Sequence, residues 1–201
     1  MDWREKYEQA AARYEAGEGR DHDERQLVQL ANAAWAAGLC LLMDGDREGA
    51  TEWLVRSATR YRESWDAGAP RDAWGRPIAA MKALLIADNA CDKLSLAAFW
   101  ALEAGAAAAE SPIGRYAATL ALLVLGRKDE AASVAATLDP PFPADVAAAL
   151  RALAAGDGGA FTMAVANVRQ SYEARDGYLE DIPIADTVLA LDALAEIRGL
   201  V

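Results

Sequence analysis

Residues 42–50 read Leu-Met-Asp-Gly-Asp-Arg-Glu-Gly-Ala, and they separate two long stretches in which apolar residues recur at helical spacing. Residues 23–43 carry one apolar stripe and residues 47–65 carry the next, so each stretch predicts an amphipathic helix. Gly45 lies between them, where glycine adopts a left-handed conformation at little cost and lets the chain reverse sharply. This stretch therefore predicts two antiparallel helices joined by a tight turn, an α-hairpin.

Four further helices are predicted to begin at a proline that precedes a small or aliphatic residue and a long apolar run. Proline suits the first helical position because its φ is already helical and the N–H that it lacks would have no partner there. Successive prolines of this kind are 35, 31 and 40 residues apart, which brackets the period of helix-pair repeats. The four prolines are Pro77, Pro112, Pro143 and Pro183.

The whole chain is predicted to be all-α, with about ten helices in antiparallel α-hairpins. Hydrophobic residues make up 54% of its 201 residues, and alanine, the strongest helix former, supplies much of that share. We expect one domain over residues 1–201, in which the C-terminal helix 183–198 caps the last apolar face. The predicted helices span residues 3–16, 23–43, 47–65, 77–87, 92–104, 112–125, 129–138, 143–155, 160–175 and 183–198.

The segment from Ala34 to Ala58 resembles a tetratricopeptide repeat, which is a pair of helices joined by a glycine turn. Ser57 stands where that family has alanine, with Ala58 beside it. The resemblance implies an α-solenoid that binds proteins or peptides. Its matching positions are Gly38, Leu41, Gly45, Ala50 and Leu54, and looser matches lie at Leu125–Ala131, closing with Leu138-Asp139-Pro140, and at Ala155–Phe161.

Two alternatives to this resemblance stay open. A generic helical bundle would explain why the repeat spacing is irregular, why the turn predicted at Asp88-Asn89 has no glycine, and why most copies lack the family's tryptophan. The last segment, from Tyr178 to Leu200, is also similar to the closing helix of helical bacterial toxin-immunity proteins. Those proteins are small and acidic, and they block a cognate toxin.

Composition limits the expected partners and compartment. The net charge of −11 repels phosphate backbones, so we expect no nucleic acid as a partner. No uninterrupted apolar run reaches the ~20 residues of a membrane span, and the charged start is no secretory signal, so we expect a cytoplasmic protein. Abundant alanine and arginine suggest a GC-rich bacterial or archaeal genome.

Cys40 and Cys91 lie in apolar helical stretches, which predicts two reduced core residues.

Catalytic and metal-binding patterns are weak in this sequence. The only histidine, His22, lies in the run Asp21-His-Asp-Glu24, where acidic residues at a helix start favour capping over metal binding. The glycines at 156–159 lie between predicted helices and lack the lysine of a phosphate-binding loop. We therefore predict a protein that is not an enzyme and that carries no cofactor.

Aromatic and arginine side chains are the best candidates for a binding surface, because interfaces favour Trp, Tyr and Arg. The longest predicted loop, residues 66–76, is flanked by such residues, and others occur on later helices. Packing of the same rings beneath the loop is the competing interpretation. The candidate partner-binding residues are Tyr61, Trp65, Arg71, Trp74, Arg76, Arg115, Tyr116, Tyr172, Arg175 and Tyr178.

The leading functional hypothesis is a non-catalytic module that binds a protein or peptide. An immunity-type inhibitor, whose acidic surface neutralises a basic toxin, is the first alternative. A small-ligand-binding protein or enzyme with a pocket between helices is the second. Pairing of two copies through the alanine-rich stretch 96–109 is a further expectation.

Overall fold

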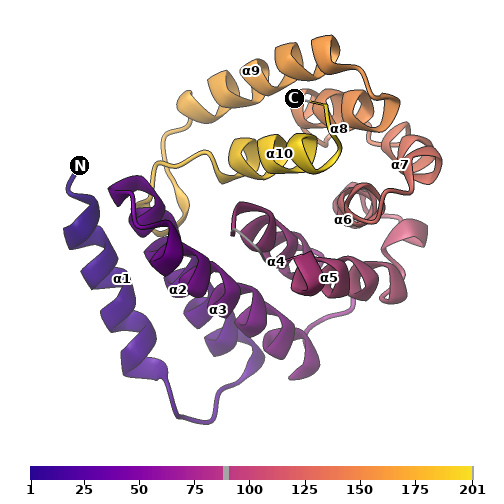
Figure 1. The fold of residues 1–201 in the computed structure, drawn as a ribbon. Coiled ribbons are helices and arrows are strands. Elements are labelled where there is room, and N and C mark those ends of the chain that lie inside the picture. The colour runs from indigo at the N-terminus through magenta and orange to yellow at the C-terminus, as the bar shows by residue number, and fades with distance from the viewer. Residues whose placement is uncertain (88–90, 201) are drawn as a thin grey trace. The chain divides into compact units, whose positions relative to one another are not determined.

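The computed structural model describes residues 1–87 and 91–200, which form ten α-helices and two short 3₁₀ turns and contain no β-strand (Figure 1). The all-α prediction is confirmed. Within each of the two compact units described below, helices that follow one another in the chain pack as neighbours. The helices are α1 (Trp3–Gly17), α2 (Glu24–Asp44), α3 (Arg47–Asp66), α4 (Gly75–Ile86), α5 (Cys91–Glu103), α6 (Pro112–Val124), α7 (Lys128–Ala135), α8 (Ala144–Ala155), α9 (Gly158–Glu173) and α10 (Asp186–Ile197), with 3₁₀ turns η1 (Ala106–Ala108) and η2 (Leu179–Asp181).

The sequence predicts that four prolines each begin a helix, but only one of them is a first helical residue. Pro112 is the first residue of α6, where the Ser111 hydroxyl caps the helix by accepting from the Ile113 N–H. Pro143 lies one residue before α8, and Pro77 lies inside the first turn of α4. Pro183 lies outside any helix, between η2 and α10, so the predicted helix 183–198 begins only at Asp186. The turn predicted at Asp88-Asn89 lies outside the described residues.

The chain divides into two compact units. The first unit, residues 1–90 with 177–184, contains α1 to α4 and η2, whereas the second unit, residues 91–176 with 185–201, contains α5 to α10 and η1. Segment 177–184 returns to the first unit, where η2 packs on α2 and Glu180 pairs with Arg13 of α1 at 2.7 Å. The prediction of one domain over residues 1–201 stays a prediction.

The α-hairpin of α2 and α3 is the centre of the first unit. Gly45 has a φ of 92°, and its N–H donates to the Leu42 carbonyl while the next N–H, of Asp46, donates to the Leu41 carbonyl. The Asp46 carboxylate then accepts from the Gly49 N–H at 2.9 Å and so caps α3. One tight turn therefore provides hydrogen-bond partners for carbonyls at the end of α2 and for an N–H at the start of α3.

Beyond this turn, small residues hold α2 and α3 at close range. A Cβ added at Gly38 would stand 2.8 Å from Leu54 Cγ and 3.2 Å from the Ala50 carbonyl oxygen, so α3 occupies the space that a side chain would need. Ser57 is fully buried against α2 and donates its hydroxyl to the Ala31 carbonyl at 2.9 Å. The hydroxyl that replaces the expected alanine thus has a partner in the core.

Aromatic rings join α1 to α3 in the first unit. Trp53 meets Tyr7 and Tyr14 edge-on, with ring centroids 6.1 and 5.2 Å apart. Arg56 lies over the Trp53 ring at 4.7 Å, and Arg60 lies over the Tyr14 ring at 5.5 Å. These ring–ring and cation–π contacts help to hold α1 against α3, because they stabilise the packing beyond what burial of apolar area contributes.

Two turns in the second unit repeat the hydrogen bonds of the Gly45 turn. Gly126 joins α6 to α7 with a φ of 75°, and Gly156 joins α8 to α9 with a φ of 71°. In each, the glycine N–H donates three residues back and the following N–H donates five residues back. Asp157 caps α9 as Asp46 caps α3, whereas Arg127 instead forms an ion pair with Glu130 at 2.5 Å. The predicted hairpins at these two glycines are confirmed.

Arginine side chains close other helix ends in the second unit. Arg151 of α8 donates to the carbonyls of Ala135 and Leu138, at the end of α7 and just beyond it. Arg198, just after α10, donates to the Val124 carbonyl at the end of α6 at 2.7 Å. Cations suit helix C-termini, where carbonyls lack intrahelical partners. The Arg151 contacts join α8 to α7, and the Arg198 contact joins α10 to α6, on which α10 packs together with α9.

Gly38→Ala is expected to lower the free energy of unfolding by about 1–2 kcal/mol, although alanine favours helices. The new methyl would overlap Leu54 and the Ala50 backbone, and overpacking of this kind costs about 1–3 kcal/mol, more than the helix propensity regained. Urea unfolding measures the change.

Gly75→Ala is the matched control, because it also adds a methyl to a helical glycine, yet nothing lies within 4 Å of the new Cβ. This variant should be unchanged or more stable by up to about 1 kcal/mol. If Gly38→Ala were as stable as Gly75→Ala, α2 and α3 would not pack as closely as described.

Candidate functional site

The loop between α3 and α4 packs its tryptophans together. Trp65, at the end of α3, and Trp74, just before α4, have ring centroids 6.0 Å apart at an angle of 40°. Trp74 is 7% exposed, and Tyr61 is 5% exposed with its hydroxyl donating to Asn32 Oδ1. Only Arg71 of this group is well exposed. Three of these rings thus pack largely within the first unit rather than form an open surface.

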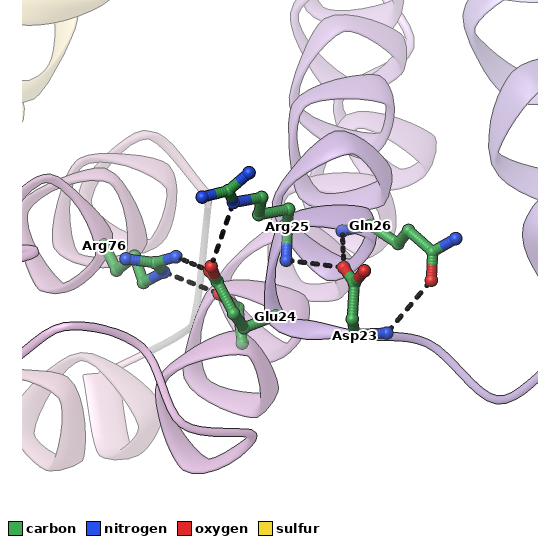
Figure 2. Close-up of polar contacts among 6 residues, drawn as sticks. Asp23, Glu24, Arg25, Gln26 and Arg76 are labelled. Carbon is green, nitrogen blue, oxygen red and sulfur yellow. Dashed lines mark hydrogen bonds and ion pairs between the residues drawn. The ribbon is translucent and has the colours of Figure 1, made fainter.

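Arg76 joins the ends of three helices in the first unit (Figure 2). From the first turn of α4, its guanidinium pairs with the Glu24 carboxylate at the start of α2 and donates to the Ser64 hydroxyl near the end of α3. Ser64 is fully buried, and the Arg76 and Glu24 side chains are 13% and 21% exposed. The arrangement satisfies a guanidinium and a carboxylate away from water, as a structural ion pair does.

Beside this pair, Asp23 and Gln26 cap the start of α2. The Asp23 carboxylate accepts from the backbone N–H groups of Arg25 and Gln26, and the Gln26 side chain accepts from the Asp23 N–H (Figure 2). The prediction that the acidic run at 21–24 caps a helix is therefore confirmed at Asp23. His22 stands outside the cap, with Nε2 2.6 Å from the Gly17 carbonyl oxygen. No cluster of metal-ligating side chains occurs within residues 1–87 and 91–200.

A pocket in the second unit brings together two of the predicted binding residues, Tyr172 and Arg175. It has a volume of about 270 Å³ and lies between the start of α8, the end of α9 and the start of α10. Segments far apart in the sequence therefore build it. Its lining residues are Pro143, Asp145, Val146, Val168, Ser171, Tyr172, Arg175, Ala185, Thr187 and Val188.

The pocket combines an apolar floor with a polar edge. Val146, Val168 and Val188 are buried, whereas Ser171 and Arg175 are exposed. The Arg175 guanidinium lies over the Tyr172 ring at 5.1 Å. Pockets that bind ligands commonly join apolar walls to a few placed polar groups. This arrangement can hold an apolar group while Ser171 and Arg175 contact polar atoms beside it.

The remaining predicted residues do not line this pocket. Tyr116 is buried on α6, 5.2 Å from the Phe142 ring, and burial together with the nearby Asp186 carboxylate raises the pKa of its phenol. Arg115 is half-buried on the same helix. Tyr178 belongs to the first unit, where it is half-buried just before η2. The candidate residues are thus spread over both units.

Sequence reasoning identified Tyr172 and Arg175 but missed the residues that complete the pocket around them. In the sequence, Val168 and Val188 look like any other apolar residues on the buried face of an amphipathic helix. The proline pattern predicts that Pro143 begins a helix, which accounts for its position just before α8 but not for its place in the pocket wall. Only the packing of α8, α9 and α10 brings these positions together.

Comparison of the chain with models of known protein families, with curated proteins and with solved structures finds no match. Among the described residues, α2 is the one helix whose length and apolar composition would suffice to cross a membrane, and 67% of its most apolar 18 residues are buried within the protein. The prediction that the chain has no membrane partner stays a prediction.

Arg76→Met is expected to lower the free energy of unfolding by about 2 kcal/mol, because the buried Ser64 hydroxyl loses its donor and the partly buried Glu24 carboxylate keeps only the exposed Arg25, 3.4 Å away. Arg62→Met is the control, since the Arg62–Asp66 pair is about half exposed on both sides and should cost less than ~0.5 kcal/mol. Equal losses in urea unfolding would show that Arg76 forms no tighter contact than a surface ion pair.

The two cysteines differ, and Cys91 corrects the prediction that both lie in the core. Cys40 is fully buried, whereas Cys91 is exposed at the first residue of α5. Burial raises the pKa of the Cys40 thiol to about 11. At pH 8 one thiol per chain should therefore react quickly with a disulfide reagent, because the thiolate is the reactive form.

Cys91→Ser should remove the fast reaction and leave Cys40 to react only on unfolding. Because folding raises the pKa of Cys40, the folded state keeps a proton that the unfolded chain loses above pH ~8.5, so this group's contribution to stability falls as the pH rises from there towards 11. Fast reaction of the one remaining thiol in Cys91→Ser would contradict the burial of Cys40.

Proposed function

We propose that this chain is a non-catalytic, degenerate tetratricopeptide-like module of a prokaryotic cytoplasm that binds a protein or peptide. The observation that carries the proposal is the pocket at the ends of α8, α9 and α10, with its valine floor and its Tyr172–Arg175 edge. The three glycine-turned hairpins support it, because helix-pair repeats commonly present binding surfaces along stacked helices.

The size of the pocket favours a partner side chain over a whole small molecule. Sites for drug-sized ligands span about 300–1,000 Å³, and this pocket has about 270 Å³. An apolar side chain of a bound segment would contact Val146, Val168 and Val188. Ser171 and Arg175 would then face polar atoms of that segment at the rim. Burial of that apolar side chain against the valines would therefore supply affinity, and the polar contacts with Ser171 and Arg175 would orient the bound segment.

Ser171→Trp tests the proposal, because a large ring on this exposed lining residue fills the pocket without disturbing the core. Peptides selected from a random library on the natural protein should bind Ser171→Trp at least about tenfold more weakly, a loss typical of an interface centre. Gln170→Trp is the control, since Gln170 is the exposed neighbour on α9 that does not line the pocket, and it should bind normally.

Fluorescence anisotropy with a labelled selected peptide measures both affinities. Equal binding by wild type, Ser171→Trp and Gln170→Trp would overturn the proposed pocket. Selection that yields no peptide with a Kd below about 100 μM, an affinity of roughly 5–6 kcal/mol, would overturn the binding function itself.

A further inference from the structure

Helix α5 carries an exposed stripe that its own unit does not cover. Asp92, Leu96, Phe99 and Glu103 follow one another at intervals of four, three and four residues, which places them along one face of the helix. Leu96 is 68% exposed and Phe99 is 49% exposed. The buried residues of α5 occupy the other positions, namely Leu94, Ala97, Ala98, Trp100 and Ala101.

The stripe combines apolar and acidic chemistry in a fixed order. Two large apolar side chains stand at its centre, and one carboxylate stands a helical turn beyond them at each end. Neither the Asp92 nor the Glu103 carboxylate has a hydrogen bond or an ion pair with any described residue. On α3 and α7, by contrast, Asp66 and Glu130 pair with arginines on their own or an adjacent turn. Among the described residues, both exposed α5 carboxylates thus stand without a cation, and the proposal below supplies one from a partner.

The charge of the stripe decides against a second copy of the chain as its occupant. Antiparallel pairing of two α5 helices about Leu96 and Phe99 would set each Asp92 against the Glu103 of the other copy. Parallel pairing would set Asp92 against Asp92 and Glu103 against Glu103. Both arrangements bring like charges together at the two ends of a small apolar contact, where such pairs cost affinity.

The surrounding surface favours a basic partner. The second unit has 13 acidic and 8 basic residues, a net charge of −5, and the whole chain has −11. Lys93 is the one exposed base of α5, and it lies to the side of the stripe rather than along it. A cationic segment would be attracted to this unit, and an anionic one would be repelled.

We propose that the α5 stripe docks a basic amphipathic helix of a partner protein. The partner's apolar side chains cover Leu96 and Phe99, and lysine or arginine residues about one turn to either side pair with Asp92 and Glu103. This is helix-on-helix recognition with apolar anchors and a charged rim. The proposal adds a second surface to the proposed binding function and does not use the pocket between α8, α9 and α10.

The test uses a synthetic probe, a fluorescent helical peptide of about four turns with leucines along one face and lysines flanking them. Binding to the full chain is followed by anisotropy. Leu96→Ser with Phe99→Ser should weaken binding at least about tenfold, because both apolar anchors are lost. Met163→Ser is the control, since Met163 on α9 is 67% exposed and nearly matches Leu96, and it should bind normally.

Charge is tested separately from apolar contact. Asp92→Asn with Glu103→Gln should weaken the lysine peptide about three- to tenfold, whereas Glu196→Gln, an exposed acid on α10, should leave it unchanged. Lys93→Glu should tighten binding. The same peptide with glutamates in place of lysines should not bind.

Three outcomes would overturn the proposal. Met163→Ser and Glu196→Gln could weaken the peptide as much as the α5 variants, which would show non-specific charge attraction. The glutamate peptide could bind as well as the lysine peptide. Sedimentation could show a dimer that Leu96→Ser dissociates, which would assign the stripe to a second copy. Ser171→Trp should leave the lysine peptide bound, so a failed pocket and a failed stripe give different results.

Discussion

The left-handed glycine at the corner of each principal hairpin is the constraint on which the structure depends. At Gly45, Gly126 and Gly156 the backbone turns with a positive φ, and the same two hydrogen bonds close the preceding helix. Because the next helix begins within two residues, it must pack antiparallel to the one before it. Close packing then requires small residues at the contact, which explains why Gly38 faces Ala50 and Leu54.

Arginines perform much of the remaining structural work. Arg76 joins three helix ends in the first unit, and Arg151 and Arg198 bind the carbonyls at the ends of α7 and α6 in the second. A planar guanidinium with five donors suits such places, since helix ends leave several carbonyls without partners. The number of arginines and aromatic rings in the sequence therefore overstates how many of these side chains are exposed for binding a partner.

The fold could be predicted closely wherever a local signal determined it. Asp23, in the acidic run predicted to cap a helix, caps α2, and Pro112 begins α6 as predicted. Both residues act at the first turn of their own helix. Prediction failed where tertiary contacts compete with local preference. Pro183 lies in a segment that belongs to the first unit and so cannot begin α10, and Cys91 faces out of an apolar helix. Trp74 and Tyr61 have the composition of an interface, yet they are buried.

The sequence by itself determined the all-α class, the ten helices and the glycine corners, because helix propensity, capping and turn chemistry act over a few residues. It also contained the spacing that places Asp92, Leu96, Phe99 and Glu103 on one face of α5. Only the tertiary structure decided which face of α5 is exposed and which helix ends meet at the pocket. Burial depends on residues far apart in the chain, and no local pattern records which of them will become neighbours.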